Sequence, residues 1–341
     1  MREIYGDLCH DILAKNQPRK LAYKKENAYD EWKGQIKSKL WELVGLEKIA
    51  KNTCPPDFQI EEDVKMDGYR RIRFTFESEK GAIVPAYLLI PDTGKEKYPV
   101  AICVQGHSTG FHNEIGVIKY ESDLNRQPRA QHALQAVSNG FAALTIEQRA
   151  MGERKTVRNS HEALMCTYSA MTALQLGRTV IGERVWDVSR AIDQLNHFSQ
   201  LDLDKIMMLG GSGGGTATFY TTCYDHRIKF AVPSYAFCSY ETSILDIFHC
   251  PCNYIPCASE WFEMQDLAAL IAPRNLLVVT GLKDRIFPID GVNEGFETVK
   301  AIYEQEGVSE KCRILITPEG HYWCTDEIWR AINEEKAKLG W

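Results

Sequence analysis

The 341-residue chain has no apolar run that approaches the roughly 18 to 20 residues of a membrane-spanning helix. Its first residues also lack the apolar core of a signal peptide, so we expect a cytoplasmic protein without membrane contact. Basic residues are not in excess, because 40 Lys and Arg stand against 46 Asp and Glu, for a net charge of −6. The sequence has no basic stripe of the kind that displaces counterions, so nucleic acid is not an expected partner.

Regular cysteine spacing is missing as well. The chain has 11 cysteines, an odd number, so we expect mostly small buried side chains and not a disulfide framework. The densest group is Cys250, Cys252 and Cys257, with Cys238 nearby. Structural zinc usually takes two separated ligand pairs at spacings of two to four residues, and this group is irregular. The sequence therefore predicts no metal and no cofactor.

The sequence shows no internal repeats, and its 44% hydrophobic content is ordinary for a globular domain. Near the N-terminus, apolar residues recur at the spacing of a helix: Trp32, Ile36, Leu40 and either Leu43 or Val44. This segment has too few apolar residues for a core of its own. We therefore expect an N-terminal helical extension, residues 1–58, that packs on a catalytic domain, residues 59–341.

The remaining sequence predicts an α/β fold. Alternating segments at 71–76 and 83–90 favour an antiparallel entry to a sheet. Short apolar runs follow, mostly separated by helical sequence, at 100–104, 142–146, 206–209, 230–232, 276–280 and 314–316. Continuous apolar strands that alternate with helices indicate a mostly parallel, twisted sheet with helices on both faces. Functional sites in such sheets form at the carboxyl ends of the strands.

The run at 206–209 leads directly into a G-x-S-x-G motif formed by Gly210, Ser212 and Gly214. A strand, a sharp turn and a helix in this order are typical of a nucleophile elbow, where small neighbours let the strand and helix pass closely. The alternative is a glycine-rich phosphate loop. The motif lacks the Lys and Ser/Thr of a Walker sequence, and no ribose-binding acid follows it. Ser212 is therefore the predicted nucleophile.

In this fold the acid and the base follow the serine in that order. Asp284 leaves the end of the strand predicted at 276–280, and His321 lies on a loop beyond the next strand. Alone, Asp284 is equally well explained as a turn former and His321 as a solvated loop residue, but their order behind the serine favours a triad. Asp290 lies in the same loop as Asp284, and we interpret it as the N-cap of the following helix.

Two backbone amides are expected to form an oxyanion hole. One is the N–H of Gly213, directly after the nucleophile, and the other is the N–H of His107, in the loop after the strand at 100–104. Gly106 permits the sharp turn there. The His107 side chain is also a candidate for lining the pocket, and the two roles are compatible.

Several segments, taken in order, resemble the acetyl xylan esterase and cephalosporin-C deacetylase group of α/β-hydrolases, with its dienelactone-hydrolase-like bacterial members. The likeness covers roughly residues 60–335 and rests on 105–107, 147–153, 177–182, 186–187, 210–214, 250–256, 271–274, 284–288 and 320–321. It implies the α/β-hydrolase fold and a triad of Ser212, Asp284 and His321. Relatives usually carry His-Gly where this chain has Gln105-Gly106, which alters the hydrogen bonding behind the oxyanion loop and leaves the backbone donors in place.

Together, the motif and the resemblance predict a serine esterase that acts on short-chain, in particular acetyl, esters of a small carbohydrate or similar alcohol through an acyl-enzyme. A lactone or small-peptide hydrolase on the same triad is an alternative, as is a binding protein with this fold and no catalysis. The sequence leaves open the acyl length, the alcohol part and whether the chain forms a homo-oligomer.

Overall fold

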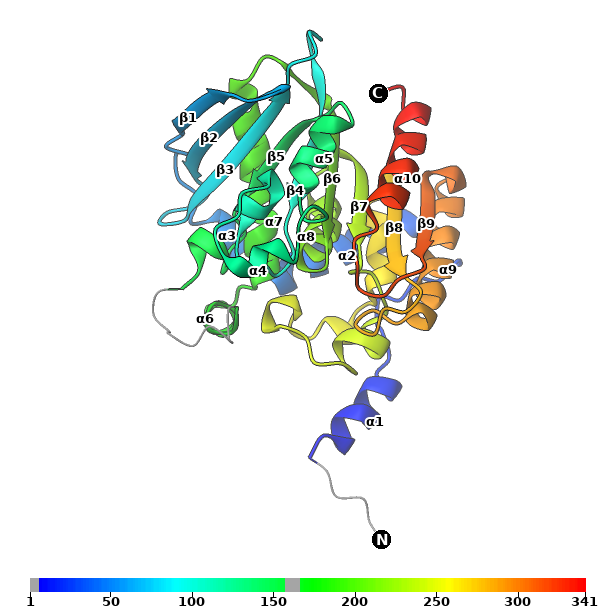
Figure 1. The fold of residues 1–341 in the computed structure, drawn as a ribbon. Helices are drawn as coiled ribbons and strands as arrows, with labels where there is room; N and C mark the ends of the chain where they lie inside the picture. Colours follow the sequence, from blue (N-terminus) through cyan, green and yellow to red (C-terminus); the bar gives the residue numbers. More distant parts are fainter. Residues whose placement is uncertain (1–5, 157–165) are drawn as a thin grey trace.

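The structure of this protein is a computed structural model that describes residues 6–156 and 166–341. Its largest element is a β-sheet. Within these residues nine strands form one sheet in the order β1-β2-β3-β5-β4-β6-β7-β8-β9 (Figure 1). The strands are β1 (Gln59–Lys65), β2 (Tyr69–Glu77), β3 (Ile83–Pro91), β4 (Tyr98–Val104), β5 (Ala142–Ile146), β6 (Leu201–Gly211), β7 (Ile228–Ser234), β8 (Asn275–Gly281) and β9 (Cys312–Thr317).

The sheet has an antiparallel edge and a parallel centre. β1, β2 and β3 pair antiparallel, as do β3 and β5, whereas every pair from β5 through β4 to β9 is parallel. The α/β prediction is thereby confirmed, and each of the six apolar runs forms a parallel strand. β1 is an additional strand that the sequence did not predict, because its residues, QIEEDVK, are mostly polar and lie largely exposed at the sheet edge.

Helices cover both faces of the parallel strands. On one face, Ala101 and Cys103 of β4 share a core cluster with α5 (His132–Ser138) and α10 (Thr325–Lys338). Val100 and Ile102 point to the opposite face, where they pack with α7 (Val180–Gln194) and α8 (Gly213–Tyr224). This alternation is the two-residue period of a strand buried on both sides. None of the described helices is both long and apolar enough to cross a bilayer.

The N-terminal helices add a further layer. The sequence-predicted helix is α2 (Tyr29–Val44), and its buried side chains are Trp32, Ile36, Leu40 and Val44. They share a core cluster with α8 and α9 (Ile289–Gln305), so this face of α2 completes the core of the sheet domain. α3 (Leu46–Ala50) follows directly, whereas α1 (Leu8–Asn16) buries no residue and projects away from the sheet in Figure 1. The other α-helices of the described residues are α4 (Glu121–Leu124) and α6 (Thr167–Gln175).

Candidate active site

Ser212 lies in a sharp turn between β6 and α8. Its backbone has φ 56° and ψ −123°, a region that side-chain-bearing residues rarely adopt and that costs roughly 1 to 3 kcal/mol. Glycine is required on both sides: a Cβ on Gly210 would lie 2.5 Å from the Val104 carbonyl oxygen, and one on Gly214 would lie 2.0 Å from it. The turn therefore has the strained, tightly packed geometry that the G-x-S-x-G motif predicts.

Asp284 and His321 meet where the loops after β8 and β9 converge. The Asp284 carboxylate is buried, and its Oδ2 lies 2.8 Å from His321 Nδ1. Its Oδ1 accepts hydrogen bonds from the amides of Ile286 (2.8 Å) and Phe287 (3.2 Å). The Phe287 ring also stacks on the imidazole, with 5.9 Å between centroids and 19° between planes. These contacts fix the carboxylate and, through it, the orientation of the histidine ring.

One cavity at the carboxyl ends of the strands brings together Ser212, His321 and His107. Its volume is about 200 Å³. The other side chains around it include Arg126, Arg129, His132, Tyr322 and Trp323. Ser212, His321 and His107 thus line one pocket, and Asp284 reaches it through its hydrogen bond to His321. Within the described residues that bond joins two members of the predicted triad, whereas Ser212 Oγ makes no hydrogen bond to His321.

The two predicted oxyanion donors are neighbours in space. A Cβ on Gly213 would lie 3.7 Å from the backbone nitrogen of His107, and one on Gly106 would lie 2.7 Å from the Gly211 carbonyl oxygen. The second distance leaves no room for a side chain, so glycine at position 106 is what allows this close approach. Neither the Gly213 nor the His107 amide donates to an acceptor within the described part of the chain. Both amides remain available to a ligand in the pocket.

The loop that carries His107 is anchored by a buried carboxylate. Gln105 Nε2 donates to Glu147 Oε1 at 2.5 Å, and the side-chain Nε2 of Gln148 donates to the Gln105 carbonyl oxygen. Burial raises the pKa of Glu147 to about 7, although backbone amides of Glu153 and Phe111 donate to it and act in the opposite direction. Gln105, where relatives usually have histidine, therefore still supplies a hydrogen bond behind the loop. Glu147 had no predicted role, because only the fold brings it to Gln105.

The interpretation of Asp290 as an N-cap is wrong. α9 begins at Ile289 with Pro288 as its N-cap, and Asp290 lies exposed in the first turn. Pro288 has φ −59° and ψ 136°, the extended backbone of an N-cap residue, so the helix starts two residues earlier than a cap at Asp290 would place it. Asp290 still favours the helix electrostatically, because a negative charge in the first turn faces the positive end of the helix dipole.

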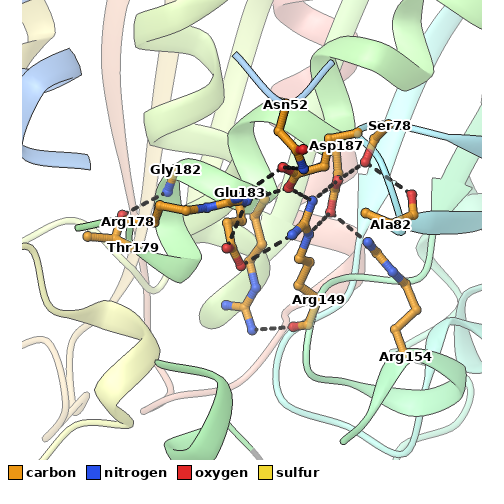
Figure 2. A network of polar contacts seen from close by, with 12 residues as sticks. Asn52, Ser78, Ala82, Arg149, Arg154, Arg178, Thr179, Gly182, Glu183 and Asp187 are labelled. Carbon is orange, nitrogen blue, oxygen red and sulfur yellow. Dashed lines mark hydrogen bonds and ion pairs between the residues drawn. The ribbon is translucent and has the colours of Figure 1, made fainter. Parts of the chain in front are cut away.

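A buried ionic network lies behind the loop that follows β5 (Figure 2). Asp187 of α7 is paired with Arg149 at 2.9 Å and Arg154 at 2.7 Å. Glu79, in the turn between β2 and β3, pairs with Arg149 at 2.6 Å and also with Arg178. The network therefore ties that turn, the loop after β5 and α7 together. Asp187 lies in the middle of α7, and its partners Arg149 and Arg154 are more than 30 residues away in sequence.

The structure also gathers four potential metal ligands, of which only Cys250 and Cys252 belong to the group considered from the sequence: His107, Cys166, Cys250 and Cys252. The prediction of no metal rested on a different set. Of its members, Cys257 is exposed and Cys238 instead contacts Thr242 and the Pro288 carbonyl. No spacing rule could have found the group, because His107 and Cys166 are far from the Cys250-Pro-Cys252 segment in sequence.

The sequence matches a model of the abhydrolase family over residues 4–237. It is 25% identical over 245 residues to the Putative hydrolase YtaP of Bacillus subtilis (strain 168), an alignment that covers 70% of this chain and 78% of that protein.

Solved structures share the fold over nearly the whole chain. A putative acetyl xylan esterase from Bacteroides fragilis NCTC 9343 has a TM-score of 0.78 at 16% identity, covering 98% of this chain and 95% of its own. A glucuronoyl esterase from Solibacter usitatus has a TM-score of 0.67 at 16% identity, covering 94% and 96%. The acetyl xylan esterase from Paenibacillus sp. R4 has a TM-score of 0.61 at 17% identity, covering 95% and 98%. The predicted α/β-hydrolase fold is confirmed.

Proposed function

Because the chain belongs to the abhydrolase family, we propose that it is a serine esterase that cleaves short-chain, in particular acetyl, esters of a small carbohydrate or a similar alcohol. The observation that carries this proposal is the arrangement around one cavity. A strained serine, a histidine bound to a buried carboxylate and two unengaged amides converge there. Acyl transfer needs a nucleophile, a base, an orienting acid and oxyanion donors, and this set supplies each of them.

The proposed mechanism has two steps. Ser212 Oγ attacks the ester carbonyl while His321 Nε2 takes its proton, and Asp284 holds the Nδ1–H and stabilises the imidazolium. The amides of Gly213 and His107 donate to the oxyanion of the tetrahedral intermediate. The imidazolium then protonates the leaving alcohol. In the second step His321 activates a water that attacks the acyl-enzyme, and the acid and Ser212 are released.

The size of the cavity supports a small substrate. Its volume of about 200 Å³ is below the roughly 300 to 1,000 Å³ of typical ligand pockets. We therefore expect kcat/KM to fall from acetyl to butyryl to octanoyl esters of the same alcohol. A profile that peaks at octanoyl esters would contradict the short-chain proposal.

Substitution of the nucleophile tests the mechanism. Ser212→Ala should lose roughly 10⁴ to 10⁶ in kcat on an acetyl ester, because the covalent step is removed. A fluorophosphonate should label the wild-type protein at Ser212 and leave the variant unlabelled. Ser138→Ala, which changes an exposed serine, is the matched control and should match the wild type. If a folded Ser212→Ala protein keeps more than about a tenth of the activity, the nucleophile is wrong.

A second candidate concerns the alcohol part, which we propose to be a sugar that carries a carboxylate. Arg126 and Arg129 line the cavity, and within the described residues neither guanidinium forms an ion pair, although that of Arg129 lies over the Tyr322 ring at 4.9 Å. Glu114, an acid that lines the same cavity, is paired with His132 at 2.9 Å. Two unpaired cations favour an anionic substrate. Arg126→Gln and Arg129→Gln should then raise KM for acetylated glucuronic acid and leave KM for acetylated glucose unchanged; an equal effect on both sugars would count against this candidate.

A further inference from the structure

The strongest unassigned feature is the cluster of ligands behind the loop that carries His107. We propose that His107, Cys166, Cys250 and Cys252 bind one zinc ion in a closed, structural site. The ligand atoms of all four residues lie within 4.8 Å of one another. They come from three separate segments: the loop after β4, the residue before α6 and the Cys250-Pro-Cys252 segment after β7.

The distances suit a tetrahedral ion. His107 Nε2 lies 3.2 Å from Cys252 Sγ and 3.6 Å from Cys166 Sγ. Zinc bonds of about 2.0 to 2.1 Å to nitrogen and about 2.3 Å to sulfur place a nitrogen and a sulfur ligand roughly 3.5 Å apart in a tetrahedron. One ion therefore fits among these atoms with small shifts of the side chains.

The donor set selects zinc. Three thiols and one imidazole form the Cys₃His combination of structural zinc sites, in which the protein fills all four positions. Soft sulfur ligands disfavour magnesium and calcium, which prefer oxygen. Two of the four ligands are shielded from water, because Cys166 and Cys252 are each 1% exposed, whereas His107 and Cys250 are partly exposed. The cluster has three cysteines, so a disulfide between two of them would still leave one free thiol.

A buried arginine supplies an independent argument from charge. Arg184 of α7 is 2% exposed, and its guanidinium lies 3.4 Å from Cys252 Sγ and 3.6 Å from Cys166 Sγ. Within the described residues its guanidinium donates to these two sulfur atoms and to the Arg149 carbonyl oxygen, and none of these partners is a carboxylate. Burying an unpaired cation is costly. Zinc with three thiolates carries a net charge of −1, which the Arg184 charge neutralises, so the zinc complex accounts for the position of this cation.

The ionic network of Figure 2 holds Arg184 in place. Arg184 donates to the Arg149 carbonyl oxygen at 3.1 Å, and the side chain of Arg149 is fixed by Asp187 and Glu79. In established metal sites, an outer layer of hydrogen bonds orients the ligands. Arg184 and its hydrogen bond to Arg149 would form part of such a layer here. The network thus gains a role, because it positions the cation that faces the sulfur atoms.

The zinc ion would act on the oxyanion loop through His107. The imidazole Nε2 faces the sulfur atoms, while the backbone amide of the same residue is the second proposed oxyanion donor. Zinc binding therefore fixes the loop that must hold this amide near Gly213. This consequence rests on the proposed esterase function, whereas the zinc content of the protein does not.

Elemental analysis tests the site directly. The full chain, purified without chelators or a metal-affinity column, should contain about one zinc per chain. Cys252→Ser and Cys166→Ala should each lose the metal. Cys257→Ser is the matched control, because Cys257 belongs to the same segment but is exposed and outside the cluster. Zinc at the wild-type level in a folded Cys252→Ser protein would overturn the proposal.

Because a cysteine variant that fails to fold also lacks zinc, the wild-type protein provides a second measurement. Titration of its thiols with an organomercurial, in the presence of a chromogenic zinc indicator, should release one zinc in step with thiol modification. Cobalt added to the zinc-free protein should give tetrahedral d–d bands and thiolate-to-cobalt charge transfer. A folded wild-type protein that contains no zinc and takes up neither zinc nor cobalt, or one with a Cys250–Cys252 disulfide, would refute the site.

Activity separates this proposal from the proposed function. If the protein contains cluster-bound zinc and lacks esterase activity, the zinc site stands and the esterase does not. If it is an active esterase, removal of zinc should lower kcat on acetyl esters roughly 10-fold or more while Ser212 still reacts with a fluorophosphonate, because an oxyanion donor is displaced and the nucleophile is not. An unchanged kcat in the zinc-free protein would show that the metal does not hold the oxyanion loop.

Discussion

Asp284 accepts hydrogen bonds on both carboxylate oxygens, and this sets the orientation of the His321 ring. The carboxylate is held at the end of β8, where the sheet is rigid, and is buried beneath the imidazole. An ionised acid in this position keeps the proton of the neutral imidazole on Nδ1 and leaves Nε2 free to act as the base. Asp290, six residues further on, has only an electrostatic effect on α9.

Substitutions of Asp284 and Asp290 should therefore have different effects. Asp284→Asn should keep the fold and lower esterase kcat on the order of 10³ to 10⁴-fold, because the histidine is held in the wrong tautomer. Asp290→Ala should cost about 0.3 to 1 kcal/mol in free energy of unfolding and keep kcat close to that of the wild type. Urea unfolding and esterase kinetics on both variants check this. Inactivation by Asp290→Ala with an active Asp284→Asn would reverse the assignment.

Glu147 makes stability depend on pH. Burial raises its pKa from an ordinary 4.5 to about 7, so the folded protein holds this proton more tightly than the unfolded chain does. The resulting stabilisation is fully present below about pH 4.5 and is lost as the pH rises through about 7. The difference between these two pKa values corresponds to about 3 kcal/mol.

Glu147→Gln removes this titration. Between about pH 4.5 and pH 8 the free energy of unfolding of the wild type should fall by about 3 kcal/mol more than that of the variant. Urea unfolding of both proteins at several pH values within this range measures the difference. Parallel pH curves would mean that the pKa of Glu147 is not raised.

At the scale of elements, the contact between α8 and β4 depends on the glycines of the nucleophile elbow. A Cβ on Gly214 would lie 2.0 Å from the carbonyl oxygen of Val104 and 3.0 Å from the carbonyl carbon of Gln105. Both of these are backbone atoms, which cannot move aside as a flexible side chain can. The helix, the strand and the oxyanion loop are therefore packed as one unit.

Gly214→Ala should disrupt the packing of α8 against β4 and the oxyanion loop. We expect a loss of about 3 kcal/mol in free energy of unfolding and a fall in kcat, because α8 must shift away from β4. Gly34→Ala is the matched control. Gly34 lies exposed in α2 with nothing within 4 Å of an added Cβ, so alanine should stabilise the helix by about 0.5 to 1 kcal/mol. Equal stability changes in the two variants would contradict this account.

At the scale of the whole molecule, α2 is part of the core. Ile36 is fully buried in the cluster that includes α8 and α9, whereas Ile12 of α1 is 54% exposed. We expect Ile36→Ala to lower the free energy of unfolding by about 2 to 5 kcal/mol, since it leaves a cavity in the shared core. Ile12→Ala should change it by less than about 0.5 kcal/mol. If the midpoint of urea unfolding of Ile36→Ala equals that of the wild type, α2 contributes little to the core.

The sequence by itself determined the parts of this protein that depend on local patterns. Apolar runs specified the parallel strands, because a strand buried on both faces must be apolar throughout. The nucleophile elbow followed from Gly210, Ser212 and Gly214, since only small residues allow so sharp a turn. In this fold the acid and the histidine follow the serine along the chain, and this order indicated Asp284 and His321. The structure brings the two within hydrogen-bond distance of each other.

Only the tertiary structure decided which residues from distant segments meet. The Asp187–Arg149 pair, the Gln105–Glu147 hydrogen bond and the cysteine cluster at His107 each join segments that are far apart along the chain. Polar side chains carry no periodic signal that could reveal such partners, because their pairing depends on how strands and loops are placed beside one another. Burial then determines the chemistry of these groups, since it raises the energetic cost of every charge left without a partner.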